Sequence, residues 1–227
     1  MSLIVKICGL STPETLDAAL DAGADMVGFV FFPPSPRNLR FDVARALGKR
    51  VRGRAQKVAL TVNADEPFLQ SIVEALRPDL LQLHGVESVA QIAAIRRAFG
   101  LPLMKALPIA IKDDLDRVGA YTAVADRLLF DARAPREATR PGGLGNTFDW
   151  RILENVQPGL PFMLSGGLDA ANVGEALRIT RASGIDVSSG VERSPGVKDV
   201  DKIIAFVRAA RAAAAQHLHR VAQESVR

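Results

Sequence analysis

A thiol and a carboxyl group are the side chains of this sequence best placed to move protons. Cys8 ends the apolar run 3–8, and Asp131 ends the apolar run 128–131. Lys6 shares one face of the first run with Cys8, because side chains alternate along an extended strand, and a neighbouring ammonium group favours the thiolate. A thiolate base and a partly desolvated carboxylic acid together suit proton transfer to and from a small substrate.

Each of these residues also has a structural interpretation. A free cysteine such as Cys8 can be a small, buried apolar side chain. Lys6 can fill a polar layer inside the fold, and Asp131 can form an ion pair with an inward-facing lysine such as Lys105. The residue types alone leave both interpretations open.

Two glycine-rich turns follow the last two apolar runs of the chain. The residues expected to approach a ligand are Gly166 and Gly167 in the first turn, and Ser188, Ser189 and Gly190 in the second. Glycines after a strand let backbone N–H groups approach a phosphate, and the dipole of a following helix adds positive potential. Either turn alone could be an ordinary tight turn, but the two together predict a phosphate site. Asp169 is expected to be the N-cap of the seventh helix.

Two further segments supply candidate ligands. Arg37 lies in a proline-rich loop, where its guanidinium group can bind a planar carboxylate through two hydrogen bonds or can simply be a solvated charge. The loop 132–146 is long enough to act as a lid, and its candidate ligands are Gly142 and Gly143. His84 has no second histidine or carboxylate at ligand spacing, so we expect a hydrogen-bonding residue and no metal site.

Short apolar runs alternate with amphipathic helical patterns along the whole chain. The runs that predict strands begin near Leu3, Asp25, Gln56, Leu80, Pro102, Arg127, Pro161 and Gly184. Eight strand–helix units predict a single-domain α/β protein, residues 1–227, folded as a (β/α)8 or TIM barrel; an open, doubly wound sheet is the alternative. The Ala-rich stretch 200–216 is expected to be the eighth helix, followed by a frayed tail of about ten residues.

The alternation of side chains along each predicted strand (its strand phase) indicates where the candidate residues point. Four of the runs carry polar residues on one face: Lys6 and Cys8, Gln82 and His84, Asp131 (on the same face as the apolar Leu129), and Asp186 and Ser188. The opposite faces are apolar and should pack on the helices. The polar set therefore points into the barrel, mainly at the carboxyl ends of the strands, where the active sites of such barrels lie.

Composition limits the classes of function. The chain has 227 residues, is 48% hydrophobic, and carries a formal net charge of +4 with basic and acidic residues interspersed. We therefore expect no nucleic-acid partner and a phosphorylated small molecule as the substrate. No apolar run approaches the ~20 residues of a membrane span, and a secretory signal is not expected at the start of the chain. The single cysteine excludes an internal disulfide, and we expect a cytoplasmic protein.

Nine short motifs stand in a fixed order along the chain. They are KICGL at 6–10, SPR at 35–37, LQLHG at 81–85, FD at 130–131, GGLG at 142–145, FDW at 148–150, SGGL at 165–168, SSGVE at 188–192 and PGVKD at 195–199. Together they resemble the phosphoribosylanthranilate isomerase family of tryptophan biosynthesis, from Val5 to about Lys202. Leu144 departs from the family pattern, which usually has a small hydroxyl residue there, so only the backbone donors of this loop are carried over.

The resemblance implies an Amadori rearrangement of N-(5′-phosphoribosyl)anthranilate to 1-(2-carboxyphenylamino)-1-deoxyribulose 5-phosphate. Asp131 would be the general acid that opens the furanose ring, and Cys8 the base that removes the C2′ proton. Arg37 would hold the anthranilate carboxylate, and the two glycine-rich turns would hold the phosphate. The remaining residues of the expected substrate site are Lys6, His84, Gly142 and Gly143. No metal or redox cofactor is implied, because the substrate nitrogen serves as the electron sink, and the expected assembly is a monomer or a homodimer.

Three other functions stay open on the sequence alone. A related aminoaldose isomerase of histidine biosynthesis uses the same chemistry, but with a carboxylate in the position of Cys8. A transferase with a thiolate nucleophile, built on Cys8 and His84, would accumulate a covalent acyl intermediate. A barrel that only binds a phosphate ligand would show no turnover.

Overall fold

The computed structural model describes residues 3–135 and 137–224, with side chains as far as residue 216. Eight of its strands form one closed sheet in sequence order. They are β1 (Ile4–Cys8), β2 (Met26–Phe31), β3 (Gln56–Thr61), β4 (Leu80–Leu83), β5 (Leu103–Ile109), β6 (Arg127–Ala132), β7 (Phe162–Leu164) and β8 (Gly184–Val187). Each begins within one residue of its predicted start.

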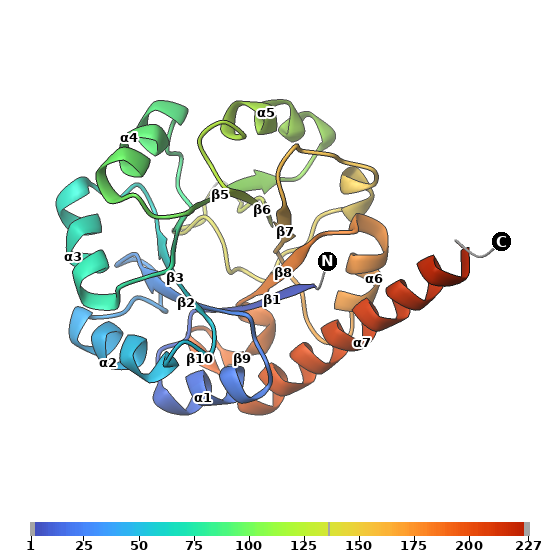
Figure 1. Cartoon of the computed structure of the whole chain (residues 1–227), viewed down its shortest axis with the longest axis horizontal. Helices are drawn as coiled ribbons and strands as arrows, with labels where there is room; N and C mark the ends of the chain where they lie inside the picture. Colours follow the sequence, from blue (N-terminus) through green and yellow to red (C-terminus); the bar gives the residue numbers. More distant parts are fainter. Residues whose placement is uncertain (1–2, 136, 225–227) are drawn as a thin grey trace.

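The pairing of β1 with β8 closes the sheet into a barrel, and all neighbouring strands are parallel. Figure 1 looks into the barrel, with the helices arranged around it. Closure confirms the predicted (β/α)8 barrel and excludes the open, doubly wound sheet.

The helical layer departs from eight regular units. The α-helices are α1 (Pro13–Asp21), α2 (Phe41–Val51), α3 (Glu66–Leu76), α4 (Val89–Phe99), α5 (Val118–Tyr121), α6 (Val173–Thr180) and α7 (Val200–Glu224). Three short 3₁₀ helices are η1 (Lys112–Arg117), η2 (Trp150–Leu153) and η3 (Ser189–Val191). The unit after β6 has η2 in place of an α-helix, because glycines and prolines occupy much of the connection.

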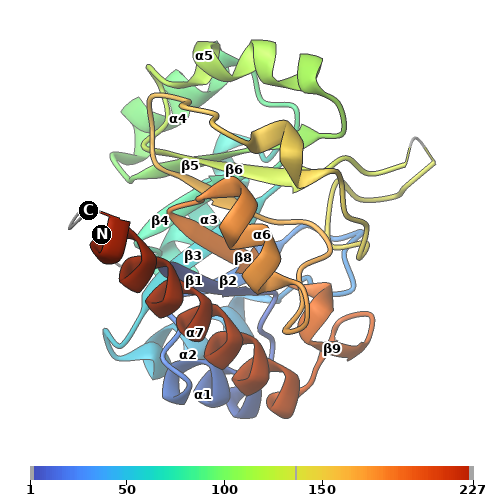
Figure 2. The ribbon, with the colours of Figure 1, turned by 90° about the vertical axis from the view of Figure 1, so that its right-hand side faces the viewer.

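The last helix is longer than predicted. Helix α7 continues to Glu224, whereas the sequence predicts its end near Gln216. Figure 2 shows α7 running along the outside of the barrel. Its Arg211 guanidinium donates to the carbonyl of Leu3 and to the carboxylate of Asp25, which ties the helix to the amino-terminal end of the barrel. Within the described residues, no helix is both long enough and apolar enough to span a bilayer.

Local signals in the sequence account for where the helices start. The Thr12 hydroxyl accepts a hydrogen bond from the backbone N–H of Thr15 and precedes Pro13 at the first position of α1. Ser88 and Gln91 form a capping box at the start of α4. These caps satisfy backbone donors that a helix start leaves without partners.

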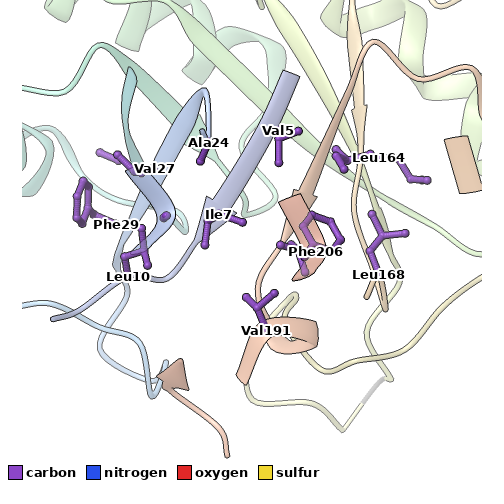
Figure 3. Close-up of a cluster of buried hydrophobic side chains, with 14 of the residues drawn as sticks. Val5, Ile7, Leu10, Ala24, Val27, Phe29, Leu164, Leu168, Val191 and Phe206 are labelled. Atoms are coloured by element: carbon purple, nitrogen blue, oxygen red, sulfur yellow. The ribbon is translucent and has the colours of Figure 1, made fainter. Parts of the chain in front are cut away.

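Two apolar layers confirm the strand phase. The outer layer packs between the strands and the helices and includes Val5, Ile7, Val27, Phe29 and Phe206, which Figure 3 draws around β1 and β2. The inner layer fills the barrel with Met26, Val58, Leu80, Met104, Ala106, Leu129 and Met163. The polar residues of the predicted inner face lie above this apolar layer, at the carboxyl ends of the strands.

Candidate active site

A cleft opens where the strands end. The predicted site residues that line it are Cys8, Arg37, His84, Asp131, Gly142, Gly143, Gly166, Gly167, Ser188 and Ser189. Lys6 and Gly190 do not line it: Lys6 is fully buried within the barrel, and Gly190 packs against the backbone of Leu168 within η3. The barrel therefore brings nearly the whole predicted set to one mouth.

The thiol of Cys8 lies above a buried ion pair. The Nζ atom of Lys6 donates to Oδ1 of Asp186 at 2.9 Å, and the two residues are register partners on β1 and β8. Cys8 packs with Val30 and Leu60 and also lines the cleft, so it is both buried and in contact with the cavity. Gly28 on β2 gives the sulfur its space, because a Cβ atom there would lie 2.8 Å from Sγ.

The sequence predicts that the Lys6 ammonium group favours the Cys8 thiolate, which would lower the pKa of the thiol. This prediction is wrong. Burial raises the pKa of the Cys8 thiol above its ordinary value of about 9, and the nearby Asp186 carboxylate adds to this. Lys6 and Lys198 pull the pKa down without offsetting the burial. For Lys6, burial acts to lower the pKa, but attraction to Asp186 and Cys8 is larger in sum and raises it, so its ammonium group stays charged.

Asp131 is held by neighbours on both carboxylate oxygens. Its Oδ2 lies 3.1 Å from Nε2 of His84, and its Oδ1 accepts the backbone N–H of Ala132 at 3.0 Å. The side-chain amide of Gln82 lies 3.1 Å from Nδ1 of His84. With the amide nitrogen donating to Nδ1, the imidazole carries its proton on Nε2 and donates it to Asp131. Gln82, His84 and Asp131 thus form a chain of contacts that ends at the cleft.

Lys105 does not pair with Asp131, so that alternative for the aspartate is wrong. Its Nζ atom lies 2.6 Å from Oε2 of Glu87 and donates to the carbonyl oxygens of Leu83 and Gly85. Glu87 also accepts the backbone N–H groups of Gly85 and Asn63. This buried cluster fixes the loop that follows β4, and with it the position of His84.

Arg37 is not a solvated loop charge, since only 4% of it is exposed. Its Nε and Nη2 atoms bind the two carboxylate oxygens of Glu192 at 2.7 and 2.8 Å, and Nη2 also donates to the carbonyl of Gly143. Lys198 donates to the same Glu192 carboxylate at 2.9 Å and to the carbonyl and hydroxyl of Ser188. One edge of the Arg37 guanidinium is therefore occupied by protein, while its Nη1 atom lies against Gly143 and has no hydrogen-bond partner among the described residues.

Glu192 and Lys198 come from a hairpin that strand phase does not predict. They lie on β9 (Glu192–Ser194) and β10 (Val197–Lys198), which pair antiparallel after β8. Burial acts to raise the pKa of Glu192, but Arg37 and Lys198 together lower it below its ordinary value. The motif SSGVE at 188–192 contains Glu192 and the motif PGVKD at 195–199 contains Lys198, but neither motif specifies a partner for Arg37.

The glycine-rich turns lie together on the β7 and β8 side of the cleft. Gly166 and Gly167 have positive φ values of 92° and 62°, and a Cβ atom at Gly166 would meet the backbone of Ala132 at 2.6 Å. Asp169 is not the N-cap of α6, which is Asn172; its carboxylate instead accepts two backbone N–H groups in the turn before the helix. The turns place backbone N–H groups beside the cleft at a short distance from the start of α6.

A parallel barrel with titratable groups gathered at the carboxyl ends of its strands belongs to the class of (β/α)8-barrel enzymes. Known proteins specify the family. The family model described as N-(5′-phosphoribosyl)anthranilate (PRA) isomerase matches residues 5–209. The chain belongs to this family.

Individual relatives agree with this assignment. The chain is 66% identical over 213 residues to N-(5′-phosphoribosyl)anthranilate isomerase of Bradyrhizobium sp. (strain ORS 278), covering 94% of this chain and 97% of that protein. It is 68% identical over 213 residues to the protein of that name from Nitrobacter hamburgensis, covering 94% and 95%. A crystal structure of phosphoribosyl anthranilate isomerase from Thermotoga maritima is similar with a TM-score of 0.83 and 32% identity, covering 92% of this chain and 99% of that one.

Proposed function

We propose that Asp131 and Cys8 act as the acid and the base that isomerise N-(5′-phosphoribosyl)anthranilate in this chain. This isomerisation is the activity of the family, and it serves tryptophan biosynthesis. A similar solved structure of the family holds reduced 1-(o-carboxyphenylamino)-1-deoxyribulose 5-phosphate, with a TM-score of 0.80 and 29% identity to this chain. The observation that carries the proposal is that a thiol and a carboxyl group from opposite parts of the sequence line one cleft beside glycine-rich turns.

The first step is opening of the furanose ring. Asp131 donates a proton to the ring oxygen, the C1′–O bond breaks, and the anthranilate nitrogen supplies the electron pair that forms an iminium at C1′. The carboxylate left behind keeps the contacts of Asp131 with the imidazole of His84 and the backbone N–H of Ala132. Both contacts favour the charge that develops on Asp131 during the transfer.

The second step is removal of the C2′ proton by the Cys8 thiolate. The C–H electron pair forms the C1′–C2′ double bond and neutralises the iminium, which gives an enolamine. The hydroxyl on C2′ then loses its proton while C1′ gains one, so the product is a ketone and both protein groups return to their starting forms. Lys6 and Lys198 provide the positive charge that favours the thiolate against burial.

The two ends of the substrate are held away from the reacting atoms. The backbone N–H groups near Gly166, Gly167, Ser189 and Gly190 bind the phosphate, and Lys198 orients this region through its contacts with Ser188. Arg37 binds the anthranilate carboxylate through Nη1, the part of its guanidinium not used by Glu192. No nucleic acid, metal or redox cofactor has a part in this mechanism.

The assembly and the location of the enzyme stay predictions. One similar solved structure concerns monomers of a dimeric isomerase from Thermotoga maritima, with a TM-score of 0.79 and 30% identity. For this chain we propose a monomer or a homodimer in the cytoplasm, and sedimentation equilibrium of the purified protein distinguishes the two assemblies.

Turnover of the substrate tests the proposed function. N-(5′-phosphoribosyl)anthranilate is fluorescent, and its fluorescence is lost on isomerisation, so the purified chain should remove the signal at catalytic concentration. Cys8→Ala and Asp131→Asn should each slow turnover by a factor on the order of 10² to 10⁴ while folding is retained. A wild-type chain that binds the substrate without consuming it would refute the enzyme assignment, and full activity in either variant would refute the role given to that residue.

A further inference from the structure

The cations around Arg37 outnumber the carboxylates that face them. Arg37 and Lys198 share the single carboxylate of Glu192. A third cation, Arg140, lines the same cleft from the loop that follows β6, and Figure 2 shows that this loop and β9 lie on the same side of the barrel. Two more carboxylates, Asp131 and Asp186, line the cleft, and Lys6 pairs with Asp186. The region therefore holds four cations and three carboxylates, and an excess of positive charge at a cleft attracts an anionic ligand.

Arg140 lies close to Arg37. The Nη2 atoms of both residues donate to the carbonyl oxygen of Gly143, at 3.5 Å from Arg140 and 3.1 Å from Arg37. Because Gly143 has a positive φ of 69° and a Cβ atom there would lie 2.5 Å from Nη1 of Arg37, only glycine allows the loop to approach so closely. Two guanidinium groups that meet at one carbonyl form a pair of donors on the same side of the cleft.

The guanidinium of Arg140 is not satisfied by protein groups. Its Nε atom is buried without a hydrogen-bond partner, and its contact with Gly143 is at the upper limit of a hydrogen bond. Among the side chains of residues 3–135 and 137–216, no carboxylate lies within ion-pairing distance of it, whereas each of Lys6, Lys105 and Lys198 has such a partner. A buried donor without a partner is unfavourable, and an arriving carboxylate would satisfy it.

The position of Arg140 also suits the aryl end of the substrate. Beside the main cleft, a second cavity is bordered by Val62, Val86, Pro108 and Pro141, and Arg140, His84 and Asp131 line both spaces. The glycine-rich turns for the phosphate come from the β7 and β8 side, so this second, largely apolar cavity is at the other end of the site. An aromatic ring there would place its ortho carboxylate within the reach of Arg140.

We propose that Arg140 binds the anthranilate carboxylate together with Nη1 of Arg37, and that it is the residue by which this chain selects a carboxylated aryl group. The inference rests on the proposed function, since it assigns a further residue to the same substrate. Arg140 acts on binding and specificity, and the acid and base steps remain with Asp131 and Cys8.

Binding of two matched ligands tests the inference. One is reduced 1-(o-carboxyphenylamino)-1-deoxyribulose 5-phosphate, and the other is the same compound without the carboxyl group. Titration calorimetry measures both with the wild type, Arg140→Met and Arg140→Lys. Arg151→Met is the control, because Arg151 is exposed and paired with Asp149 away from the cleft.

Arg140→Met should weaken binding of the carboxylated ligand by about 10- to 100-fold, the range of a charge-assisted hydrogen bond, and leave the other ligand within about threefold. Arg140→Lys should fall between wild type and Arg140→Met, and Arg151→Met should match wild type. Equal weakening of both ligands would show a purely structural role for Arg140, and no weakening of either would show no role; each result overturns the inference. If the wild type binds neither ligand, the proposed function itself fails.

Discussion

Lys198 should make the stability of this protein depend on pH in a defined direction. Its side chain is 1% exposed, and burial lowers the pKa of its ammonium group to about 8 from an ordinary 10.5, even though Glu192 favours the charged form. In the folded protein Lys198 therefore releases its proton near pH 8, whereas in the unfolded chain it keeps the proton until near pH 10.5. Between these values the unfolded state binds more protons, so rising pH stabilises the folded state.

The size of this effect follows from the two pKa values. At neutral pH, burying the charged Lys198 side chain makes folding less favourable. Loss of its proton between about pH 7 and about pH 9.5 therefore raises the free energy of unfolding by about 2 kcal/mol. Lys198→Met cannot show the change, because methionine does not titrate. Glu192 keeps its two hydrogen bonds from Arg37 in this variant, so no buried carboxylate is left without a partner.

Urea denaturation of wild type and Lys198→Met across this pH range measures the effect as a difference between the two proteins. The free energy of unfolding of wild type, minus that of Lys198→Met, should increase by about 2 kcal/mol as pH rises. Ile204→Met, an exposed substitution on α7 that removes no titratable group, should show no such trend. A flat difference for Lys198→Met would refute the low pKa, and a shift in the opposite direction would mean that the ion pair outweighs burial.

Three further predictions follow from the cleft. Because burial raises its pKa, Cys8 should react slowly with iodoacetamide at neutral pH and faster through and above pH 9; a rate that levels off below pH 8 would contradict this. Arg37→Lys should raise KM in steady-state kinetics, since lysine lacks the fork that binds a carboxylate, and unchanged KM and kcat would exclude a binding role. Gly142→Ala should lower kcat, because its Cβ would collide with Oδ2 of Asp131, whereas Gly119→Ala, with no atom within 4 Å, should not; equal kcat values would contradict the contact.

Strand positions could be predicted from the sequence because side-chain alternation has a fixed period. The alternation of Lys6 and Cys8 with Val5 and Ile7 predicts which residues face inward, and the two apolar layers confirm it. The same alternation brought Cys8 and Asp131 to one mouth, since all parallel strands of a barrel end on the same side.

The charge environment could not be predicted in the same way. Lys6 precedes Cys8 by two residues, so the sequence shows the cation but neither the burial nor the Asp186 partner from β8. The contact of Arg37 with Glu192 joins residues 155 positions apart, through a hairpin that no alternation predicts. Pairings of this kind depend on how distant segments meet, and the local pattern carries no information about them.

Loss of deuterium from C2′ of the substrate is the most direct test of the acid–base mechanism. In a single turnover followed by deuterium NMR, which detects the deuteron whether it passes to C1′ or to solvent, wild type should remove the C2′ deuteron as fluorescence is lost. Cys8→Ala and Asp131→Asn should each slow this removal by a factor on the order of 10² to 10⁴. Removal at the wild-type rate in Cys8→Ala would contradict the account, because the proton from C2′ would then leave to a group other than the thiolate.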